Sequence, residues 1–262
     1  MPDLGRVSDE LRKGVPQIGS FISIPNTAVI EIAGCSGLDF VVLDAEHGLF
    51  DRTEIENLVR AADVAGLSAI VRVPDIRGGW IATALDVGAA GVVVPHVNTV
   101  ADARAAVDQC RYPPDGKRGV GGGRATLFGA RLASYLGTAN SQILVAVQIE
   151  TAEGLANVEA IAAVDGIDVI FVGPADLAVS LGVFREVFGS AVGADGKTRL
   201  DVAIAAIAAA ARSHGRQLGT FVPQASEIDR WTAAGFHFLI LGSDVGMLTQ
   251  SYATLLRGEA RQ

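Results

Sequence analysis

The chain has 262 residues, of which 50% are hydrophobic and 6% aromatic, so aliphatic side chains must build its core. The formal net charge is −8 and no block of lysine and arginine stands out, which argues against a nucleic-acid partner. No apolar run approaches the roughly 18 residues that cross a bilayer, and the charged residues 1–14 lack the apolar stretch of a signal peptide. We therefore expect a soluble cytoplasmic protein, in which Cys35 and Cys110 are small buried thiols.

Short β-branched runs bounded by Gly, Pro or Asp recur along the chain and predict eight strands. Stretches with Ala and Leu at helical spacing separate them. The predicted strands are 17–24, 40–43, 69–73, 91–94, 143–149, 168–172, 217–222 and 238–241, and the clearest helices are 52–65, 100–109, 152–162, 202–214 and 227–234.

This alternation predicts a parallel sheet with helical crossovers, and eight repeats favour closure into a single (β/α)8 TIM barrel. No shift in composition marks a boundary, so we expect residues 1–262 to form one domain. Residues 111–141 and 182–200 interrupt this alternation of strands and helices. They are predicted to be long connections, which are often functional.

Polar residues that directly follow the apolar runs are the candidates for a site, because barrel enzymes work at the carboxyl ends of their strands. The second run ends in Asp44, Glu46 and His47, the third in Arg72, the fourth in His96, the fifth in Gln148 and Glu150, and the sixth in Gly173, Pro174, Ala175 and Asp176.

Glu150 and Asp176 end neighbouring strands and can reach one cation, since adjacent strands lie about 4.8 Å apart. Two oxygen ligands leave positions open for a bidentate 2-oxo acid, which suits Mg²⁺, Mn²⁺ or Co²⁺ better than tetrahedral Zn²⁺. The structural alternative is that each carboxylate only stabilises the first turn of a helix.

His47 follows a strand-end Asp and Glu, so we predict that it is the general acid/base, with a lone surface histidine as the alternative. Arg72 ends an aliphatic strand and is predicted to face an enolate or oxyanion. Its alternative is a purely structural pairing with Asp44 or Glu46. His96 has no acidic neighbour in sequence, and we do not assign it a role.

Lysines bear on whether the site can form a covalent adduct with a carbonyl substrate, because a Schiff base needs an amine at a strand end. The chain has three lysines, Lys13, Lys117 and Lys197, and none ends a predicted strand. The segment GADGKT resembles a P-loop only in part, since Ala191 stands where glycine is required and no strand leads into it. The glycine-rich residues 119–124 are interpreted as a mobile loop over the site or at a subunit contact.

The chain resembles the HpcH/HpaI aldolase family, the metal-dependent pyruvate aldolases, over nearly its whole length. The stretches that carry the resemblance are LDAEHGLFD, IVRVP, LDVGAAGVVVPHV, RYPPDGKRGVG, VQIET and FVGPADLAVSLG. The chain departs from familiar members at GVGGGRATLFGAR and at TFVPQ. These departures leave the identity of the aldehyde undecided, but they do not affect the expectation that pyruvate is the other product.

The resemblance implies a role for each matching residue. It places the catalytic histidine on His47, the transition-state arginine on Arg72, and the metal carboxylates on Glu150 and Asp176. It makes Gln148 and the backbone of Gly173, Pro174 and Ala175 pyruvate contacts. Asp44 and Asp86 match acidic positions that support the histidine, Asp86 by reaching a neighbouring subunit of a homo-oligomer, which the family suggests is a hexamer.

The implied reaction is cleavage of a 4-hydroxy-2-oxo acid to pyruvate and an aldehyde, and the reverse addition. A divalent metal and Arg72 would stabilise the enolate. Two rival readings remain open: a lyase of the citryl-CoA or malyl-CoA type, which needs room and cationic contacts for coenzyme A, and a barrel that only binds a metal carboxylate.

Overall fold

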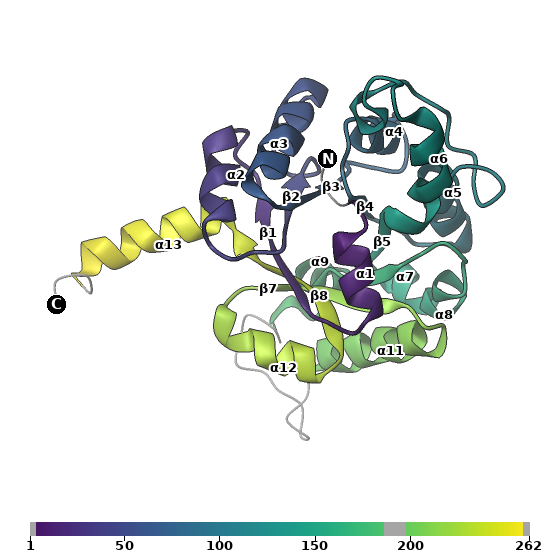
Figure 1. Cartoon of the computed structure of the whole chain (residues 1–262). Coiled ribbons are helices and arrows are strands. Elements are labelled where there is room, and N and C mark those ends of the chain that lie inside the picture. Colours follow the sequence, from purple (N-terminus) through teal and green to yellow (C-terminus); the bar gives the residue numbers. More distant parts are fainter. Residues whose placement is uncertain (1–3, 186–197, 259–262) are drawn as a thin grey trace.

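All eight predicted strands are present and form a closed parallel barrel in chain order. The structure is a computed structural model that describes residues 4–185 and 198–258. Each strand pairs with the next, and β1 closes the ring by pairing with β8. The strands are β1 (Gln17–Ile22), β2 (Phe40–Asp44), β3 (Ser68–Arg72), β4 (Gly91–Val94), β5 (Leu144–Ile149), β6 (Val169–Val172), β7 (Gln217–Val222) and β8 (Phe236–Ser243). The predicted TIM barrel is confirmed (Figure 1).

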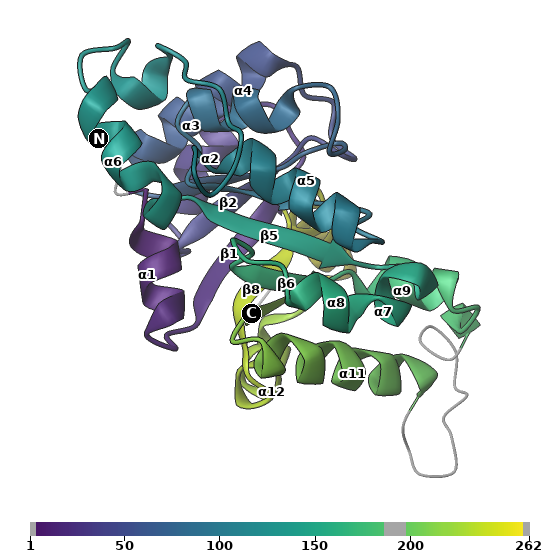
Figure 2. The same cartoon turned by 90° about the vertical axis from the view of Figure 1, so that its right-hand side faces the viewer.

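Helices surround this barrel and connect its strands (Figures 1 and 2). In chain order they are α1 (Arg6–Arg12), α2 (Thr27–Gly34), α3 (Arg52–Ala65), α4 (Trp80–Asp86), α5 (Val100–Cys110), α6 (Leu132–Gln142), α7 (Ala152–Ala156), α8 (Val158–Ala162), α9 (Pro174–Ser180), α11 (Arg199–Ser213), α12 (Ile228–Ala233) and α13 (Asp244–Arg257), with short 3-10 turns η1 (Arg124–Thr126) and η2 (Ala225–Glu227).

The helices differ from the sequence prediction at two places. The helix expected over 152–162 is two short helices that meet at Asn157, whose φ of −101° and ψ of 2° leave the helical region. The connection expected over 111–141 contains η1 and the whole of α6. Helix α6 buries only Tyr135 and Ala139, so its sequence carries little of the apolar periodicity by which helices are recognised.

Side chains that alternate along the strands fill the interior of the barrel. Phe40 and Phe238 stack there with ring centroids 4.6 Å apart. Gly19 and Gly219 make room for these rings, because a Cβ atom at Gly19 would lie 2.3 Å from the Phe40 ring. This aromatic floor closes the barrel beneath its carboxyl end, so any site there is a shallow cup and not a channel.

Helix α13 stands apart from the other long helices, and Figure 1 shows it projecting away from the barrel. Asp244 is its only buried residue, whereas α11 buries seven. An apolar groove lies where a barrel normally packs its last helix, between α2 and the first turns of α13. Its lining includes Ile22, Val29 and Ile32. Helix α13 therefore does not fully cover the outer face of β8 and β1, where the last helix of a barrel is expected to pack.

Three remaining sequence predictions can be placed against the structure. Cys110 is buried as expected, whereas Cys35 is exposed at the end of α2, where the helix meets a turn. No helix among the described residues is long and apolar enough to cross a membrane. Residues 186–197, which hold Lys197 and most of the GADGKT segment, lie outside the described residues.

Candidate active site

The strand alternation delivers three predicted side chains to one end of the barrel. In β2, β3 and β5, the interior positions Val42, Ile70 and Ala146 are each followed two residues later by a polar residue. These residues are Asp44, Arg72 and Gln148, all buried. Because a strand has a period of two, each of them turns toward the barrel axis above the aromatic floor.

Arg72 is held on several sides by side chains from neighbouring elements. Its Nε and Nη2 atoms donate to the two oxygens of Asp44, at 2.8 and 2.7 Å. Its Nη1 lies 3.2 Å from Glu46 Oε2, and its guanidinium carbon lies 4.3 Å from the centre of the Phe21 ring. The bidentate pairing fixes the plane of the guanidinium, so Arg72 presents a positive charge of defined orientation at the mouth of the barrel.

Two buried carboxylates meet around a histidine beside this arginine. Glu150 Oε1 accepts the backbone N–H of His96 at 2.7 Å and lies 3.0 Å from His96 Nδ1. The other ring nitrogen of His96 lies 3.1 Å from Glu46 Oε1. One ligand atom from each of these three residues lies within 4.8 Å of the others, which is close enough to hold a cation.

The environment of Glu46 opposes its ionisation on balance. Burial raises the pKa of this carboxyl above its usual value, and the charge of Glu150 acts in the same direction. Arg72, His47 and His96 lower the pKa but do not cancel the effect of burial. A further cation placed between Glu46 and Glu150 would relieve this mutual repulsion.

Gly173 brings the end of β6 against the same carboxylate. A Cβ atom at Gly173 would lie 3.0 Å from Glu150 Oε2 and 3.1 Å from Gln148 Nε2, so a side chain at this position would crowd both groups. Gln148 Nε2 donates to Glu150 Oε2. The Oε1 atom of Gln148 is buried without a hydrogen-bond partner and is free to accept from a bound ligand.

A cavity of about 280 Å³ opens over these groups. Most of the predicted residues line it, together with aromatic and serine side chains that the sequence did not single out. The lining residues are Phe21, Ser23, Asp44, His47, Arg72, Gln148, Phe171, Gly173, Pro174, Ala175, Asp176, Phe221 and Ser243. A space of this size is suited to a small acid, and Asp176 enters it from the first turn of α9.

His47 lies at the exposed rim of this cavity. Its side chain is 65% exposed, and its Nε2 lies 3.9 Å from Glu46 Oε2. Asp44 accepts the backbone N–H of His47 at 3.3 Å, and so holds the main chain of His47. The imidazole is therefore accessible to a ligand, and the loop beneath it is anchored.

Asp86 is the one predicted residue that the fold places elsewhere. It ends α4 and precedes β4, so it lies at the amino end of the strands, opposite the cavity. Its Oδ1 accepts from Arg118 at 2.9 Å, and Gly121 and Gly123 pack against it. The glycine-rich residues 119–124 therefore lie against α4 and do not cover this chain's own cavity.

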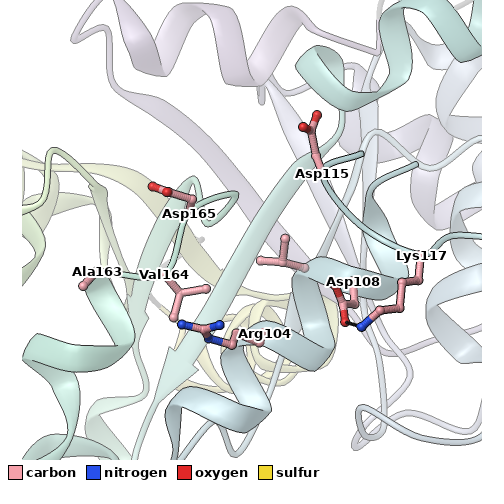
Figure 3. A pocket seen from close by; sticks show the side chains of 8 residues that line it. Arg104, Asp108, Asp115, Lys117, Ala163, Val164 and Asp165 are labelled. Atoms are coloured by element: carbon pink, nitrogen blue, oxygen red, sulfur yellow. Dashed lines mark hydrogen bonds and ion pairs between the residues drawn. The ribbon is translucent and has the colours of Figure 1, made fainter. Parts of the chain in front are cut away.

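A second hollow lies at that opposite end, between the end of α5 and the turn after α8 (Figure 3). Its charged lining includes Asp108, Lys117 and Asp165. Lys117 Nζ lies 2.5 Å from Asp108, and Lys13 pairs with Glu10 before β1. Both described lysines are therefore on surface ion pairs away from the cavity, as expected from their sequence positions.

The sequence missed two residues at the centre of the site and one that anchors it. Glu46 and His96 both follow strands, and this position was the only sign in the sequence that they could belong to a site. Their contact with Glu150 brings together residues that follow β2, β4 and β5. Asp244 accepts the backbone N–H groups of Ser23 and Ile24 at 2.9 to 3.1 Å, and so fixes the loop after β1. A lone aspartate after β8 gave no sign of this long-range contact.

The donor chemistry of the site fits a hard divalent cation. Asp176 and Gln148, whose Oε1 has no hydrogen-bond partner, line the cavity, and Glu150 lies against Gln148 and Gly173 beside it. Glu46 and His96 offer further donors beside Glu150. Oxygen-rich sets of this kind select Mg²⁺ or Mn²⁺ over metals that prefer thiolate or several imidazoles.

Known proteins resemble this chain in both sequence and structure. It is 37% identical to 5-keto-4-deoxy-D-glucarate aldolase of Klebsiella pneumoniae over 232 residues, covering 88% of this chain and 87% of that one. It is also 37% identical to 4-hydroxy-2-oxovalerate aldolase of Rhodococcus jostii over 246 residues, covering 94% and 92%. An HpcH/HpaI aldolase/citrate lyase family crystal structure from Burkholderia cenocepacia matches with a TM-score of 0.88, 34% identity and coverage of 98% and 100%.

The family model for HpcH/HpaI aldolase/citrate lyase matches residues 17–251, which run from the first strand of the barrel into its last helix. This chain is a member of the HpcH/HpaI aldolase/citrate lyase family and an enzyme of the aldolase and lyase class.

Proposed function

We propose that the protein is a divalent-metal-dependent aldolase that cleaves 4-hydroxy-2-oxo acids to pyruvate and an aldehyde, and catalyses the reverse addition. The observation that carries the proposal is the buried, doubly anchored Arg72 in a small cavity that Asp176 also lines, with Glu150 next to the lining residues Gln148 and Gly173. A fixed, buried positive charge is what an enolate requires. The names of the aldolase relatives support the same chemistry.

Each residue of the cavity has a proposed task. The planar guanidinium of Arg72 faces the oxygen of the 2-oxo group and stabilises the negative charge that develops there. His47 exchanges a proton with the C4 hydroxyl of the acid, because its ring is at the open rim where the aldehyde half extends. Asp44 positions both, through the guanidinium of Arg72 and the main chain of His47.

The acid end of the substrate is proposed to lie against β5 and β6. Gln148 and the backbone of Gly173, Pro174 and Ala175 line this side of the cavity. Glu150 and Asp176 would hold Mg²⁺, Mn²⁺ or Co²⁺. When bound, the cation supplies positive charge beside the carboxylate and 2-oxo oxygens.

The assay follows release of pyruvate from 4-hydroxy-2-oxo acids that differ only in the aldehyde half. We expect cleavage to stop after exhaustive treatment with EDTA and to return on addition of Mg²⁺, Mn²⁺ or Co²⁺. Full activity after chelation would contradict the metal requirement. Absence of turnover with every member of the series would leave only a binding function.

Borohydride trapping separates this chemistry from that of a Schiff-base aldolase. Neither described lysine is near the cavity, so pyruvate and borohydride should leave the protein mass unchanged. A known Schiff-base aldolase treated in parallel is the positive control. A stoichiometric adduct on any lysine, including Lys197, would overturn the proposal.

The rival reading as a CoA lyase has less support. Coenzyme A is large and anionic, and would need both space and cations at the rim. The cavity measures about 280 Å³, and the only arginine or lysine among its lining residues, all of which are described, is the buried Arg72. Turnover of a CoA thioester faster than of any 4-hydroxy-2-oxo acid would favour the rival.

We propose that the chain is one domain, located in the cytoplasm, and that it assembles into a homo-oligomer, with a hexamer suggested by the family. Pairing of β1 with β8 supports the single domain, and the two free cysteines fit a reducing compartment. The exposed apolar stripe of α13, formed by Val245, Leu248, Tyr252 and Leu255, supports assembly. In an oligomer this stripe would cover the apolar groove of a second copy, and Asp86 would approach a neighbour's His47.

Native mass measured by light scattering tests this assembly. Leu255→Glu on the stripe and Ile32→Glu in the groove should each reduce the mass to that of smaller species, because each buries a charge in the same contact. Val64→Glu is the matched control, since Val64 is 84% exposed on α3 and does not line the groove. An unchanged mass in both test variants would contradict this contact.

A further inference from the structure

We propose that His96 is a positioning residue that holds the carboxylate of Glu150 in its metal-binding orientation. This inference rests on the proposed assignment of Glu150 to the metal. His96 follows Pro95 at the end of β4, and its side chain lies between two carboxylates that are 7% and 1% exposed. No role was assigned to it from the sequence, because its acidic partners come from β2 and β5.

The backbone of His96 is shaped for this contact. Its φ is +55°, in the left-handed region that only a few per cent of residues other than glycine adopt, histidine among the commoner of them. Such a conformation persists only where surrounding contacts determine it, and it is found at functional sites more often than elsewhere. Here it turns both the N–H and the Nδ1 atom of one residue onto the same oxygen, Glu150 Oε1.

The two oxygens of Glu150 are thereby given different surroundings. Oε1 is occupied by His96, whereas Oε2 accepts from Gln148 and faces Gly173, on the side where Asp176 enters the cavity. A carboxylate fixed in this way cannot rotate to exchange its oxygens without breaking the His96 contacts. The oxygen nearest the substrate side is therefore set by His96.

The same ring also links the two charged halves of the site. Its Nε2 lies 3.1 Å from Glu46 Oε1, and the other oxygen of Glu46 lies 3.2 Å from Arg72. Without the ring, Glu46 and Glu150 would be buried carboxylates with no group between them, and mutual repulsion would displace one of them. Glu150 would keep only neutral donors, the backbone N–H of residue 96 and Gln148, whereas Glu46 would retain the positive charge of Arg72.

Three substitutions at position 96 separate the parts of this contact. His96→Gly keeps the left-handed backbone and its N–H donor but removes the ring. His96→Asn restores a side-chain donor at the position of Nδ1 and tolerates the same backbone. His96→Gln places its donor farther out, toward Glu46. His214→Asn, at a half-buried histidine far from the cavity that pairs with Glu159, is the matched control.

The readout is the dissociation constant of Mn²⁺, measured by electron paramagnetic resonance on the chelated protein without substrate. Loss of a partner that orients a metal ligand typically weakens binding about 10- to 100-fold, so this loss is expected for His96→Gly. We expect His96→Asn to bind within a few-fold of wild type and His96→Gln to resemble His96→Gly. Melting temperature, recorded for every variant, identifies any that fail to fold.

Three further variants distinguish failure of this inference from failure of the proposed function. Glu150→Gln and Asp176→Asn must both weaken Mn²⁺ binding if these residues are the metal ligands. If they do while folded His96→Gly binds as wild type, the positioning role is wrong. If Asp176→Asn binds as wild type while His96→Gly and Glu46→Gln do not, the histidine is itself a ligand, which also overturns the inference.

Discussion

The two ends of the barrel differ in how their charged residues are connected. At the carboxyl end, the Arg72 and Glu150 side chains are 9% and 1% exposed and belong to one connected network. At the amino end, the Lys117 side chain is 81% exposed and pairs with Asp108 near solvent. The amino end also buries Arg111 and Arg118, each paired with one aspartate. At the carboxyl end, however, Glu46 joins Arg72 to His96, and His96 joins Glu46 to Glu150. Burying charge is costly unless each group is paired, so a connected network of this kind beside a cavity marks the candidate site.

The hollow in Figure 3 illustrates the same contrast, because a depression with charged walls is not by itself a site. Its charges stand on α5 and on turns, and the Lys117 and Asp165 side chains are exposed to solvent. The charged residues of the cavity lie on strands or soon after them, and contacts with residues of other strands hold their side chains in place. Rigid placement of charge, and not its mere presence, is what catalysis requires.

The largest effect is expected from a carboxyl-end residue that the fold does not need. His47→Ala should lose cleavage about 10²- to 10⁴-fold, the usual range for a positioned acid or base. It should retain exchange of the pyruvate methyl protons with deuterium, since that step does not involve the C4 hydroxyl. Parallel assays of pyruvate release and of exchange by NMR decide this, and loss of both would show that His47 also serves enolisation.

Arg72→Lys tests whether orientation matters beyond charge. A lysine ammonium cannot reproduce the fork that pairs with Asp44. We expect kcat to fall about 10²- to 10³-fold, in the range for loss of a main oxyanion partner, while Mn²⁺ affinity stays near that of wild type. A kcat close to wild type would show that Arg72 has only a structural role.

Gly173→Ala adds one methyl group at the tightest point of the site. The new Cβ would lie within about 3 Å of Glu150 and Gln148 and push them out of place, and a displacement of this kind lowers kcat by up to about 10²-fold. Gly137→Ala is the matched control, because no atom lies within 4 Å of its added Cβ. Equal activity in the two variants would contradict the crowding.

The smallest effect is expected at the amino end. Lys117→Ala removes an exposed ion pair and should change the free energy of unfolding by less than about 1 kcal/mol. We expect its kcat to remain within about twofold of wild type, since surface changes away from a site are usually near neutral. Denaturant titration and the cleavage assay measure these values. A large loss of activity would remove the distinction between the two ends.

Much of this arrangement could be predicted from the sequence, because it depends on local rules. The period of two places Asp44, Arg72 and Gln148 on the inner face of their strands, and alternation with helices brings the strand ends together. The triad of Glu46, His96 and Glu150 could not be predicted in this way. It depends on contacts across several strands and on a left-handed backbone that no local pattern specifies.

The position of α13 could not be predicted from the sequence either. Its apolar residues have helical spacing, but spacing does not say whether the helix packs on its own barrel or on another. Asp86 shows the same limit, since its match to a catalytic position gave no hint that α4 carries it to the opposite end. The assembly proposed above would account for both features.

Exchange of the methyl protons of pyruvate in D₂O tests the central claim most directly, because it isolates enolate formation from the choice of aldehyde. The protein is chelated, divided, and followed by NMR with and without added Mg²⁺. We predict exchange only in the sample with metal, and none in Arg72→Lys under the same conditions beyond the rate in buffer with Mg²⁺. Equal exchange in chelated and metal-loaded wild-type protein would contradict a metal-dependent pyruvate enolate.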